Sequence, residues 1–382
     1  MDYAATTPVD PVVAARMAEC LGPDGIFGNP GSTSHAYGEA ASDRVEAARA
    51  EVAATVGAEP DEVIWTSGAT EANNLAIFGV AQYNAQVGRH IVTVRTEHKS
   101  VLDPCRELER RGWRVSYLTP DKSGVLDPAE VAAALRPDTV LVSVMHVNNE
   151  IGVIQDIASI AALCARSGSA RLHVDAAQSI GKCAVNFSGL GIDLMSLSAH
   201  KAYGPKGVGA LIVSHAKGVQ LKPLQYGGGQ EKTLRSGTVA THQVVGMGAA
   251  LALVKADPQH EIRRIARLRD RLWDGLRSIG GVLRNGDPER SVPHLLNVSF
   301  EGVEGESLLA AVRPHIAVST GSACTSISRE PSYVLRALGR DDRLAESSLR
   351  FSLGRFSTDE DADAAVSVVR RAVERLRRIG GA

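Results

Sequence analysis

The stretch SLSAHKAYGPKGVGALIVS, residues 196–214, joins two short apolar runs through a polar loop that contains His200 and Lys201. The runs LMSLS (194–198) and VGALIVS (208–214) have the length and composition of buried β-strands. A lysine in a loop is normally a solvated surface charge. Lys201 becomes informative only if the rest of the chain brings other functional groups to the same strand end.

Five more apolar runs of this kind occur upstream, and helical patterns such as VEAARAEVAATVG (45–57) and IASIAALCARSG (157–168) separate most of them. The runs are VIWTS (63–67), HIVTV (90–94), RVSYLT (114–119), TVLVSVMHV (139–147) and RLHVD (171–175). Strands of this composition that alternate with helices predict an α/β fold, with a mostly parallel seven-stranded sheet covered on both faces. Ligands of such sheets bind in loops beyond the carboxyl ends of the strands.

The pattern changes after residue 255, and 382 residues are too many for one ordinary core. The stretch PQHEIRRIARLRDRLWDGLRSIGG (258–281) predicts one long amphipathic helix. It is followed by the segments LLNVSF, PSYVLRALG and SSLRFSLG and a terminal helix. We therefore predict a large domain at residues 16–255. Residues 1–15 and 256–382 form a smaller α+β domain, which carries a polar loop at about 318–331.

Composition narrows the class of protein. The formal net charge is −1, which gives no general attraction to nucleic acid or membrane, and no apolar run is long enough to span a bilayer. The five cysteines form no CxxC pair, and the N-terminus MDYAATTPVD lacks the pattern of a signal peptide. We expect a cytoplasmic protein without disulfides.

Polar groups follow several of the predicted strands. TSGATEANNLA (66–76) predicts a helix N-terminus that can bind an anion, although Ser67 or Thr66 could equally be an ordinary helix cap. Asp175 ends the strand in HVDAAQS (173–179), where it could be a buried charge with a partner or a helix N-cap. His98 in RTEHKSV (95–101) could be catalytic or structural.

Taken together, these groups match the needs of one cofactor. Pyridoxal phosphate (PLP) requires a lysine for a Schiff base, a carboxylate against its pyridinium nitrogen, a phosphate site and a flat group over its ring. Lys201, Asp175, the turn at 67–70 and His98 supply one of each. The sequence therefore predicts a PLP enzyme.

Longer motifs then show a resemblance that covers nearly the whole chain. DYAATTPVDP, FGNPGSTSH, TSGATEANNLAI, TEHKSVLDPC, MHVNNEIGVIQDI, HVDAAQSIGK, AHKAYGPKGVGAL, RSGT, LNVSF, GSACTS and LRFSLGRF resemble the cysteine desulfurases of the IscS/NifS group. These are class V aminotransferase-like, fold-type I PLP enzymes and homodimers. The resemblance implies removal of sulfur from L-cysteine, which gives L-alanine and a persulfide on an enzyme cysteine.

The resemblance also implies roles for individual residues. Lys201 would form the Schiff base, Cys324 would carry the persulfide, and His98 would stack on the ring and act as an acid or base. Asn149 and Arg350 would orient the substrate. The remaining cofactor contacts would be Asp175 at the pyridinium nitrogen, Gln178 at the phenolic oxygen, Ala69, Thr70, Ser198 and His200 at the phosphate, and Thr238 from the other subunit.

Some positions depart from the family pattern. Ala199 stands where the family usually has Gly, and Ala177 where Thr is common. The start at MDYAATTP suggests a short first strand, and the end at RLRRIGGA lacks the extension that binds the Fe–S scaffold protein. The acceptor of the sulfur stays open between Fe–S cluster assembly, tRNA thiolation and DNA phosphorothioation. With a scaffold partner, Cys324 would also be a transient Fe–S ligand.

Cys324 lies in VSTGSACTSISREPSY (318–333), a stretch without apolar periodicity. We expect a mobile loop whose thiol moves between the cofactor and an acceptor protein, with Pro331 at the start of the next helix. The alternative interpretation is another fold-type I PLP enzyme, such as a selenocysteine lyase or an aminotransferase, in which Cys324 is incidental.

Overall fold

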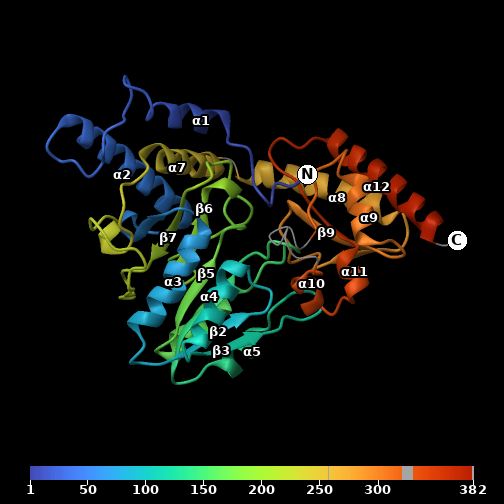
Figure 1. The fold of residues 1–382 in the computed structure, drawn as a ribbon, viewed down its shortest axis with the longest axis horizontal. Helices are drawn as coiled ribbons and strands as arrows, with labels where there is room; N and C mark the ends of the chain where they lie inside the picture. Colours follow the sequence, from blue (N-terminus) through green and yellow to red (C-terminus); the bar gives the residue numbers. More distant parts are fainter. Residues whose placement is uncertain (257, 321–329, 381–382) are drawn as a thin grey trace.

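A computed structural model describes residues 1–256, 258–320 and 330–380 (Figure 1). Its main sheet has seven strands in the order β1-β7-β6-β5-β4-β2-β3. The strands are β1 (Val63–Thr66), β2 (His90–Val94), β3 (Arg114–Leu118), β4 (Thr139–Met145), β5 (Arg171–Asp175), β6 (Leu194–Ser198) and β7 (Gly209–Val213). All seven apolar runs of the sequence form strands here, so the predicted α/β fold is confirmed.

Strand direction determines which loops share an edge of this sheet. Strands β3, β2, β4, β5 and β6 pair in parallel, while β7 runs antiparallel to both of its neighbours, β6 and β1. Two reversals in succession make β1 parallel to β6. The carboxyl ends of β1, β2, β4, β5 and β6 therefore lie at one edge, where α/β sheets bind their ligands.

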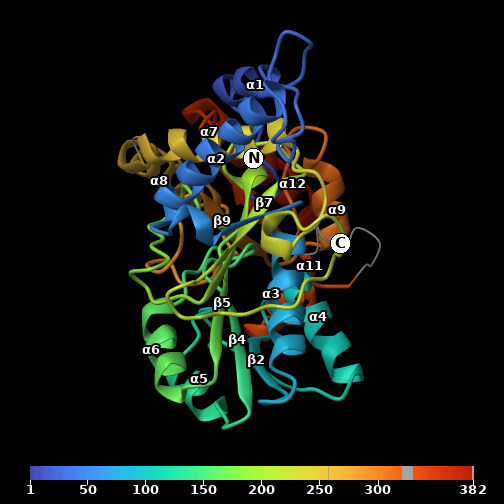
Figure 2. The same ribbon diagram turned by 90° about the vertical axis from the view of Figure 1, so that its left-hand side faces the viewer.

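Helices cover both faces of the sheet, as Figure 2 shows for α5 and α6 on one side and α3 and α4 on the other. The helices α2 (Ala36–Val56), α5 (Pro128–Ala134), α6 (Ile157–Ser167) and α7 (Thr241–Ala256) contribute to the hydrophobic cluster on the first face. The helices α3 (Ala69–Tyr83) and α4 (Lys99–Arg110) pack on the second. Helix α1 (Pro11–Ala18) contacts α7.

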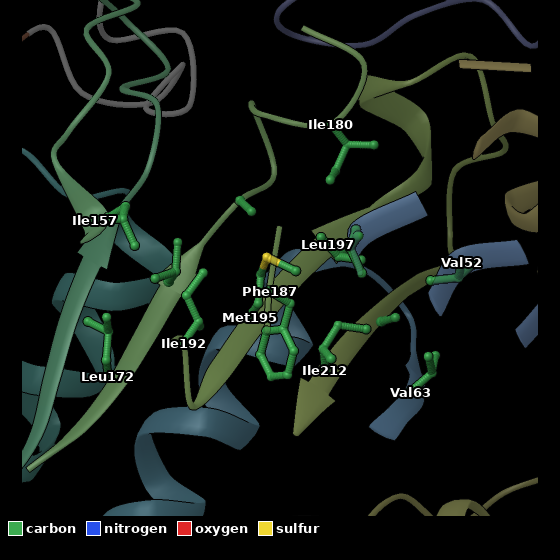
Figure 3. Packing of buried hydrophobic residues seen from close by; sticks show 14 of the residues in the cluster. Val52, Val63, Ile157, Leu172, Ile180, Phe187, Ile192, Met195, Leu197 and Ile212 are labelled. Atoms are coloured by element: carbon green, nitrogen blue, oxygen red, sulfur yellow. The ribbon is translucent and has the colours of Figure 1, made fainter. Parts of the chain in front are cut away.

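Alternation along the strands explains why both faces are covered. Met195 and Leu197 of β6 and Ile212 of β7 point into the cluster on the first face, which is drawn in Figure 3. Their neighbours Leu194 and Leu211 pack on the opposite face, against α3 and α4. Successive side chains of a strand point to opposite sides, so a continuous apolar run requires two apolar layers.

A second sheet, of three strands in the order β10-β9-β8, is built from the C-terminal part of the chain. Its strands are β8 (Val282–Asn285), β9 (Leu295–Phe300) and β10 (Ser348–Ser352). Figure 1 shows α8, α9 and α12 beside this sheet, on the right of the molecule, while α2 lies on the left. The helices of this region are α8 (Pro258–Arg277), α9 (Gly305–Val312), α10 (Tyr333–Ala337), α11 (Asp342–Glu346) and α12 (Asp359–Gly380).

The N-terminus joins this second sheet, since Asp2 forms a parallel bridge with Ser352. The division into residues 16–255 on one side and 1–15 with 256–382 on the other stays a prediction. Strand β8 has no counterpart among the segments predicted from the sequence. The predicted start of a helix at Pro331 is wrong: α10 begins at Tyr333, because the Ser332 hydroxyl accepts the N–H of Leu335 and caps the helix.

None of the helices in the described part of the chain is long and apolar enough to cross a membrane. In the same residues no three His, Cys, Asp or Glu side chains gather to form a metal site. Cys324, predicted as an Fe–S ligand, lies outside the described residues.

Candidate active site

A cavity of about 620 Å³ opens at the edge of the main sheet where the parallel strands end. Loops after β1, β2, β4, β5 and β6 contribute to its wall, together with the N-terminus and β10. The structure brings most of the predicted site residues together here: Ala69, Thr70, His98, Asn149, Asp175, Gln178, Ser198, His200, Lys201 and Arg350 all line the cavity. Two predicted residues are not among them. Thr238 is exposed on a loop outside it, and Cys324 lies outside the described residues.

The N-terminus of α3 forms one wall of the cavity. Its N-cap is Gly68, which has a φ of 150° and makes no side-chain cap bond, so the predicted cap at Ser67 or Thr66 is wrong. The physical reason is that Glu71 takes the N–H of Ser67 instead, at 2.7 Å, and is itself held by Arg235. The first-turn N–H groups have no acceptor within the helix, and the helix dipole favours an anion at this end.

Lys201 ends a short 3₁₀ helix, Ala199–Lys201, that directly follows β6. Its Nζ donates hydrogen bonds to the carbonyl oxygens of Ala4 and Ala5, at 2.6 and 2.7 Å. Thr7 holds the N-terminal segment in place, since its N–H and hydroxyl both donate to the carbonyl of His200. Lys201 is therefore an ordered group at a cavity wall, and the interpretation as a solvated surface lysine is wrong.

Asp175 is the last residue of β5 and is buried, at 6% exposure. One carboxylate oxygen accepts from the side-chain amide of Asn73 at 2.8 Å, and the other accepts from the N–H of Ala177 at 3.0 Å. The residues after it form a turn, so Asp175 caps no helix. A buried carboxylate with two donors is stabilised as the anion.

His98 follows β2 and is the N-cap of α4. Its Nδ1 accepts the backbone N–H of Ser100 at 3.1 Å and lies 2.8 Å from the Ser100 hydroxyl. A backbone N–H can only donate, so Nδ1 carries no proton in this arrangement. In the neutral ring the proton is therefore on Nε2.

Arg350 of β10 is buried on the side of the cavity that the second sheet contributes. Its guanidinium donates to the carbonyl of Asn149 at 2.8 Å and to the carboxylate of Asp2 at 2.9 Å. Its backbone also exchanges hydrogen bonds with Ser319, at 2.7 and 3.3 Å. The chain just before the segment 321–329 is thereby attached beside the cavity.

The charge of this region is lowered by burial of its bases. Burial, with Lys201 nearby, lowers the pKa of His200 to about 4. Burial, together with the charges of Lys201 and Arg350, also lowers the pKa of Lys182 to about 7; its Nζ donates to Gln178 at 3.2 Å. Gln178 in turn donates to the carbonyl of Ala4. His200 is therefore uncharged at neutral pH, and Lys182 is close to the midpoint of its titration.

Some buried polar atoms of the cavity could form hydrogen bonds with a ligand. Among the described residues, Asn149 Oδ1, Ser198 Oγ and Arg350 Nε are buried without a hydrogen-bond partner, and all three residues line the cavity. Such atoms are costly unless a ligand or water satisfies them. Their chemistry, together with Lys201, Asp175 and the N-terminus of α3, fits a phosphorylated pyridine aldehyde with an amino-acid substrate.

Two side chains and two backbone carbonyls that contribute to the site were not predicted from the sequence. Asn73 and Ser100 lie within the motifs TSGATEANNLA and TEHKSVLDPC, but both look like ordinary polar residues of a helix, and nothing in the motifs assigns them to the site. The carbonyls of Ala4 and Ala5 carry no side-chain chemistry and leave no signal in a sequence.

Comparison with known proteins agrees with this geometry. The family model for aminotransferase class-V matches residues 1–365. The chain is 55% identical over 377 residues to a protein named cysteine desulfurase IscS from Pectobacterium atrosepticum, covering 99% of this chain and 93% of that protein.

Two solved structures are also similar. A NifS-like protein shares 34% identity with a TM-score of 0.92, covering 98% of this chain and 99% of that chain. A structure of SspA in complex with cysteine shares 37% identity with a TM-score of 0.82, covering 94% and 99%. The chain therefore belongs to the aminotransferase class-V family, and within it to the IscS/NifS group of cysteine desulfurases.

Proposed function

We propose that this protein is a PLP-dependent cysteine desulfurase, which transfers the sulfur of L-cysteine to Cys324 and leaves L-alanine. The observation that carries the proposal is that one cavity contains Lys201 and Asp175 together with three buried atoms, Asn149 Oδ1, Ser198 Oγ and Arg350 Nε, that have no hydrogen-bond partner among the described residues. The group membership of the chain supports the same reaction.

The cofactor would be held by groups that the cavity already presents. Lys201 would attach it covalently, Asp175 would face its ring nitrogen, and Gln178 its phenolic oxygen. The first turn of α3, with Ala69 and Thr70, and the hydroxyl of Ser198 would take the phosphate. When bound, PLP supplies an electron-withdrawing ring that stabilises negative charge on an attached amino acid.

L-Cysteine would be bound through its carboxylate by Arg350 and Asn149. The Nε of Arg350 is free to donate among the described groups, and a guanidinium presents two parallel donors to a carboxylate. Lys201 would hold and return the proton of the substrate at Nζ. His98, with its proton on Nε2, would donate from that atom. To accept a proton from a thiol at Nδ1, it would first have to leave the N–H of Ser100.

The sulfur transfer would need a reactive thiol. The Cys324 thiolate would attack the substrate sulfur, forming an S–S bond while the C–S bond breaks and its electron pair stays on the carbon fragment, which is protonated to L-alanine. Among the other four cysteines, burial raises the pKa of Cys105, Cys164 and Cys183 to about 12, and raises that of Cys20. Thiols of this kind are poor nucleophiles.

The ends of the segment that carries Cys324 support its assignment. On one side, Ser319 pairs with Arg350 of the cavity wall. On the other, Tyr333 donates to the carbonyl of Glu97, next to His98, and Ser332 donates to Glu150. Both ends of the segment are therefore attached to groups beside the cavity, which supports delivery of the Cys324 thiol to it.

The experiment that tests the function is turnover of L-cysteine with a thiol reductant. The wild-type protein should release sulfide and L-alanine in equal amounts, and Cys324→Ser should lose sulfide release while keeping the yellow colour of the bound cofactor. Cys183→Ser is the matched control and should keep both. Sulfide release by Cys324→Ser at the wild-type rate would contradict the assignment. Formation of a keto acid would indicate an aminotransferase, and a strong preference for selenocysteine a selenocysteine lyase, alternatives that the relatives do not favour.

We also propose that the protein is a homodimer. Thr238 is exposed outside the cavity of its own chain, and nearby Tyr226 is 78% exposed. Phe27 and Tyr37, whose rings lie 5.4 Å apart, are 53% and 61% exposed. Aromatic side chains are enriched at protein–protein interfaces, which supports the proposal. Light scattering should give twice the chain mass, and a monomer that binds PLP as well as the dimer would contradict a role for Thr238.

The persulfide would pass to an acceptor protein of Fe–S assembly, tRNA thiolation or DNA phosphorothioation, with Cys324 a transient metal ligand if the acceptor is an Fe–S scaffold. The four described cysteines form no disulfide, which fits the reducing cytoplasm expected from the sequence. Capture of a protein that accepts labelled sulfur from the Cys324 persulfide would identify the pathway.

A further inference from the structure

A chain of hydrogen bonds links His98 to Asp175 beneath the cavity. Its links are His98 Nδ1 to Ser100 Oγ, Ser100 Oγ to Asn73 Nδ2, and Asn73 Nδ2 to Asp175 Oδ2, each 2.8 Å long. His98, Ser100 and Asp175 line the cavity, and Asn73 of α3 is completely buried between the last two.

The direction of these hydrogen bonds follows from their chemistry. The amide nitrogen of Asn73 has two hydrogens, and it donates one to Asp175 and the other to Ser100. The opposite amide orientation would place the Asn73 oxygen against the carboxylate of Asp175, two acceptors with no hydrogen between them. Ser100 keeps its own hydroxyl hydrogen for His98. Asn73 is thus the donor at the centre of the chain.

The contact is not explained by packing alone. Asn73 stands beside Ala72, Leu75 and Ala76, which belong to the apolar cluster under α3. Its side-chain oxygen is buried with no hydrogen-bond partner among the described residues. A buried amide that is only partly satisfied lowers stability compared with an apolar side chain of similar size. A role in packing alone would therefore favour leucine at this position.

The Asp175 carboxylate, which Asn73 contacts, lies among other buried titratable side chains. Two further titratable side chains, Glu97 and His173, interact with Asp175. Burial raises the pKa of Glu97 well above its usual value, which favours its uncharged form, and burial lowers the pKa of His173 to about 4, so His173 is uncharged at neutral pH. His173 bonds to the hydroxyls of Ser143 and Ser196 instead. Asn73 and the N–H of Ala177 are the donors that the described contacts give to the Asp175 carboxylate.

We propose that Asn73 is a positioning residue for the cofactor: it holds the Asp175 carboxylate toward the ring nitrogen and, through Ser100, ties His98 to the same support. This inference rests on the proposed function, because it requires a PLP ring between Asp175 and His98. Asn73 itself does not line the cavity, so it acts only through its two neighbours.

The test compares two variants with a matched control. Asn73→Leu keeps the number and branching of the side-chain heavy atoms but removes both donors, and Asn73→Ala removes the branched group as well. The control is Asn74→Ala, because Asn74 is the adjacent residue but lies on the exposed side of α3, bonded to the carbonyl of Thr70. For each protein, the apoenzyme is titrated with PLP to give a dissociation constant, and its melting temperature is measured without PLP.

We expect Asn73→Leu to raise the PLP dissociation constant about tenfold, as for the loss of one hydrogen bond to a charged group. Its apoenzyme should melt somewhat below the wild-type temperature, because the buried Asp175 carboxylate loses a donor, and kcat should fall with little change in KM for L-cysteine. Asn74→Ala should match the wild type. A merely structural role would lower the melting temperature and leave PLP affinity unchanged, so PLP affinity is the measurement that separates the two roles.

The inference is overturned if Asn73→Leu binds PLP within about twofold of the wild type. PLP binding by Asn73→Ala within about twofold of the wild type would also overturn it. If one of the two variants does not fold, the other still tests the inference. Failure of the wild-type apoenzyme to bind PLP would instead overturn the proposed function.

Discussion

At the scale of single residues, buried polar groups with incomplete bonding distinguish the site from the rest of the sheet. Arg350, Asn149 and Ser198 each have a buried atom without a hydrogen-bond partner in the described part of the chain, and all three line a cavity to which both sheets contribute. Lys201 and Asp175 could be predicted because each residue directly follows an apolar strand. The role of Asn73 could not be predicted, because an asparagine within a helical pattern is expected to face solvent. Only the packing of α3 on the sheet shows that it is buried.

Glu97 allows a prediction about pH at this scale. Its pKa is raised by burial and by Asp175, so the folded protein keeps a proton that the unfolded chain has lost. Folding therefore takes up a proton, and the free energy of unfolding should fall as the pH rises above about 4.5 toward the raised pKa. Glu97→Gln removes this dependence while keeping an acceptor for the N–H of Met145.

Thermal unfolding between pH 5 and pH 8 would check this expectation. The melting temperature of Glu97→Gln should exceed that of the wild type by a margin that grows with pH. Glu130→Gln, at an exposed position of α5, is the control and should follow the wild type. A constant margin across the range would mean that Glu97 is ionised in the folded protein.

At the scale of elements, β7 and the start of α3 are packed too closely for a side chain. A Cβ on Gly209 would lie 2.4 Å from the carbonyl oxygen of Leu197 and 2.7 Å from Cα of Gly68, and both are backbone atoms. Gly209→Ala should therefore push β7 away from the N-cap of α3, lowering the free energy of unfolding by about 1–3 kcal/mol and weakening PLP binding. Denaturant unfolding and PLP titration measure the two effects.

The control for this change is Gly22→Ala, since a Cβ there would meet no atom within 4 Å. It should leave both measurements unchanged. If Gly209→Ala lowered stability but left PLP affinity intact, the first turn of α3 would not depend on β7 for its position.

At the scale of the whole molecule, the N-terminus connects the two sheets to the site. Asp2 bridges to Ser352 of β10, the N–H of Ala4 donates to the Ser352 hydroxyl at 2.8 Å, and the carbonyl of Ala4 accepts from Lys201. Ser352→Ala would leave the buried N–H of Ala4 without this acceptor. We expect a loss of about 1–3 kcal/mol in the free energy of unfolding.

The same substitution should weaken PLP retention, because the Ala4 carbonyl positions Lys201. Ser357→Ala, which removes a hydroxyl bonded to the N–H of Gly354, is the control and should lower stability without changing PLP retention. Equal loss of PLP in both variants would indicate a general effect of β10 and its surroundings.

The sequence by itself determined the seven strands, the helices between them and the type of chemistry at their ends. Apolar periodicity and strand-end residues act over a few neighbouring positions, so they can be read along the chain. The tertiary structure alone decided the antiparallel direction of β7, the addition of β8 and the partners of Lys201 and Asp175. Those contacts join residues about 100 to 200 positions apart, such as Asn73 with Asp175 and Ala4 with Lys201. Their formation depends on how whole layers pack, which no local pattern records.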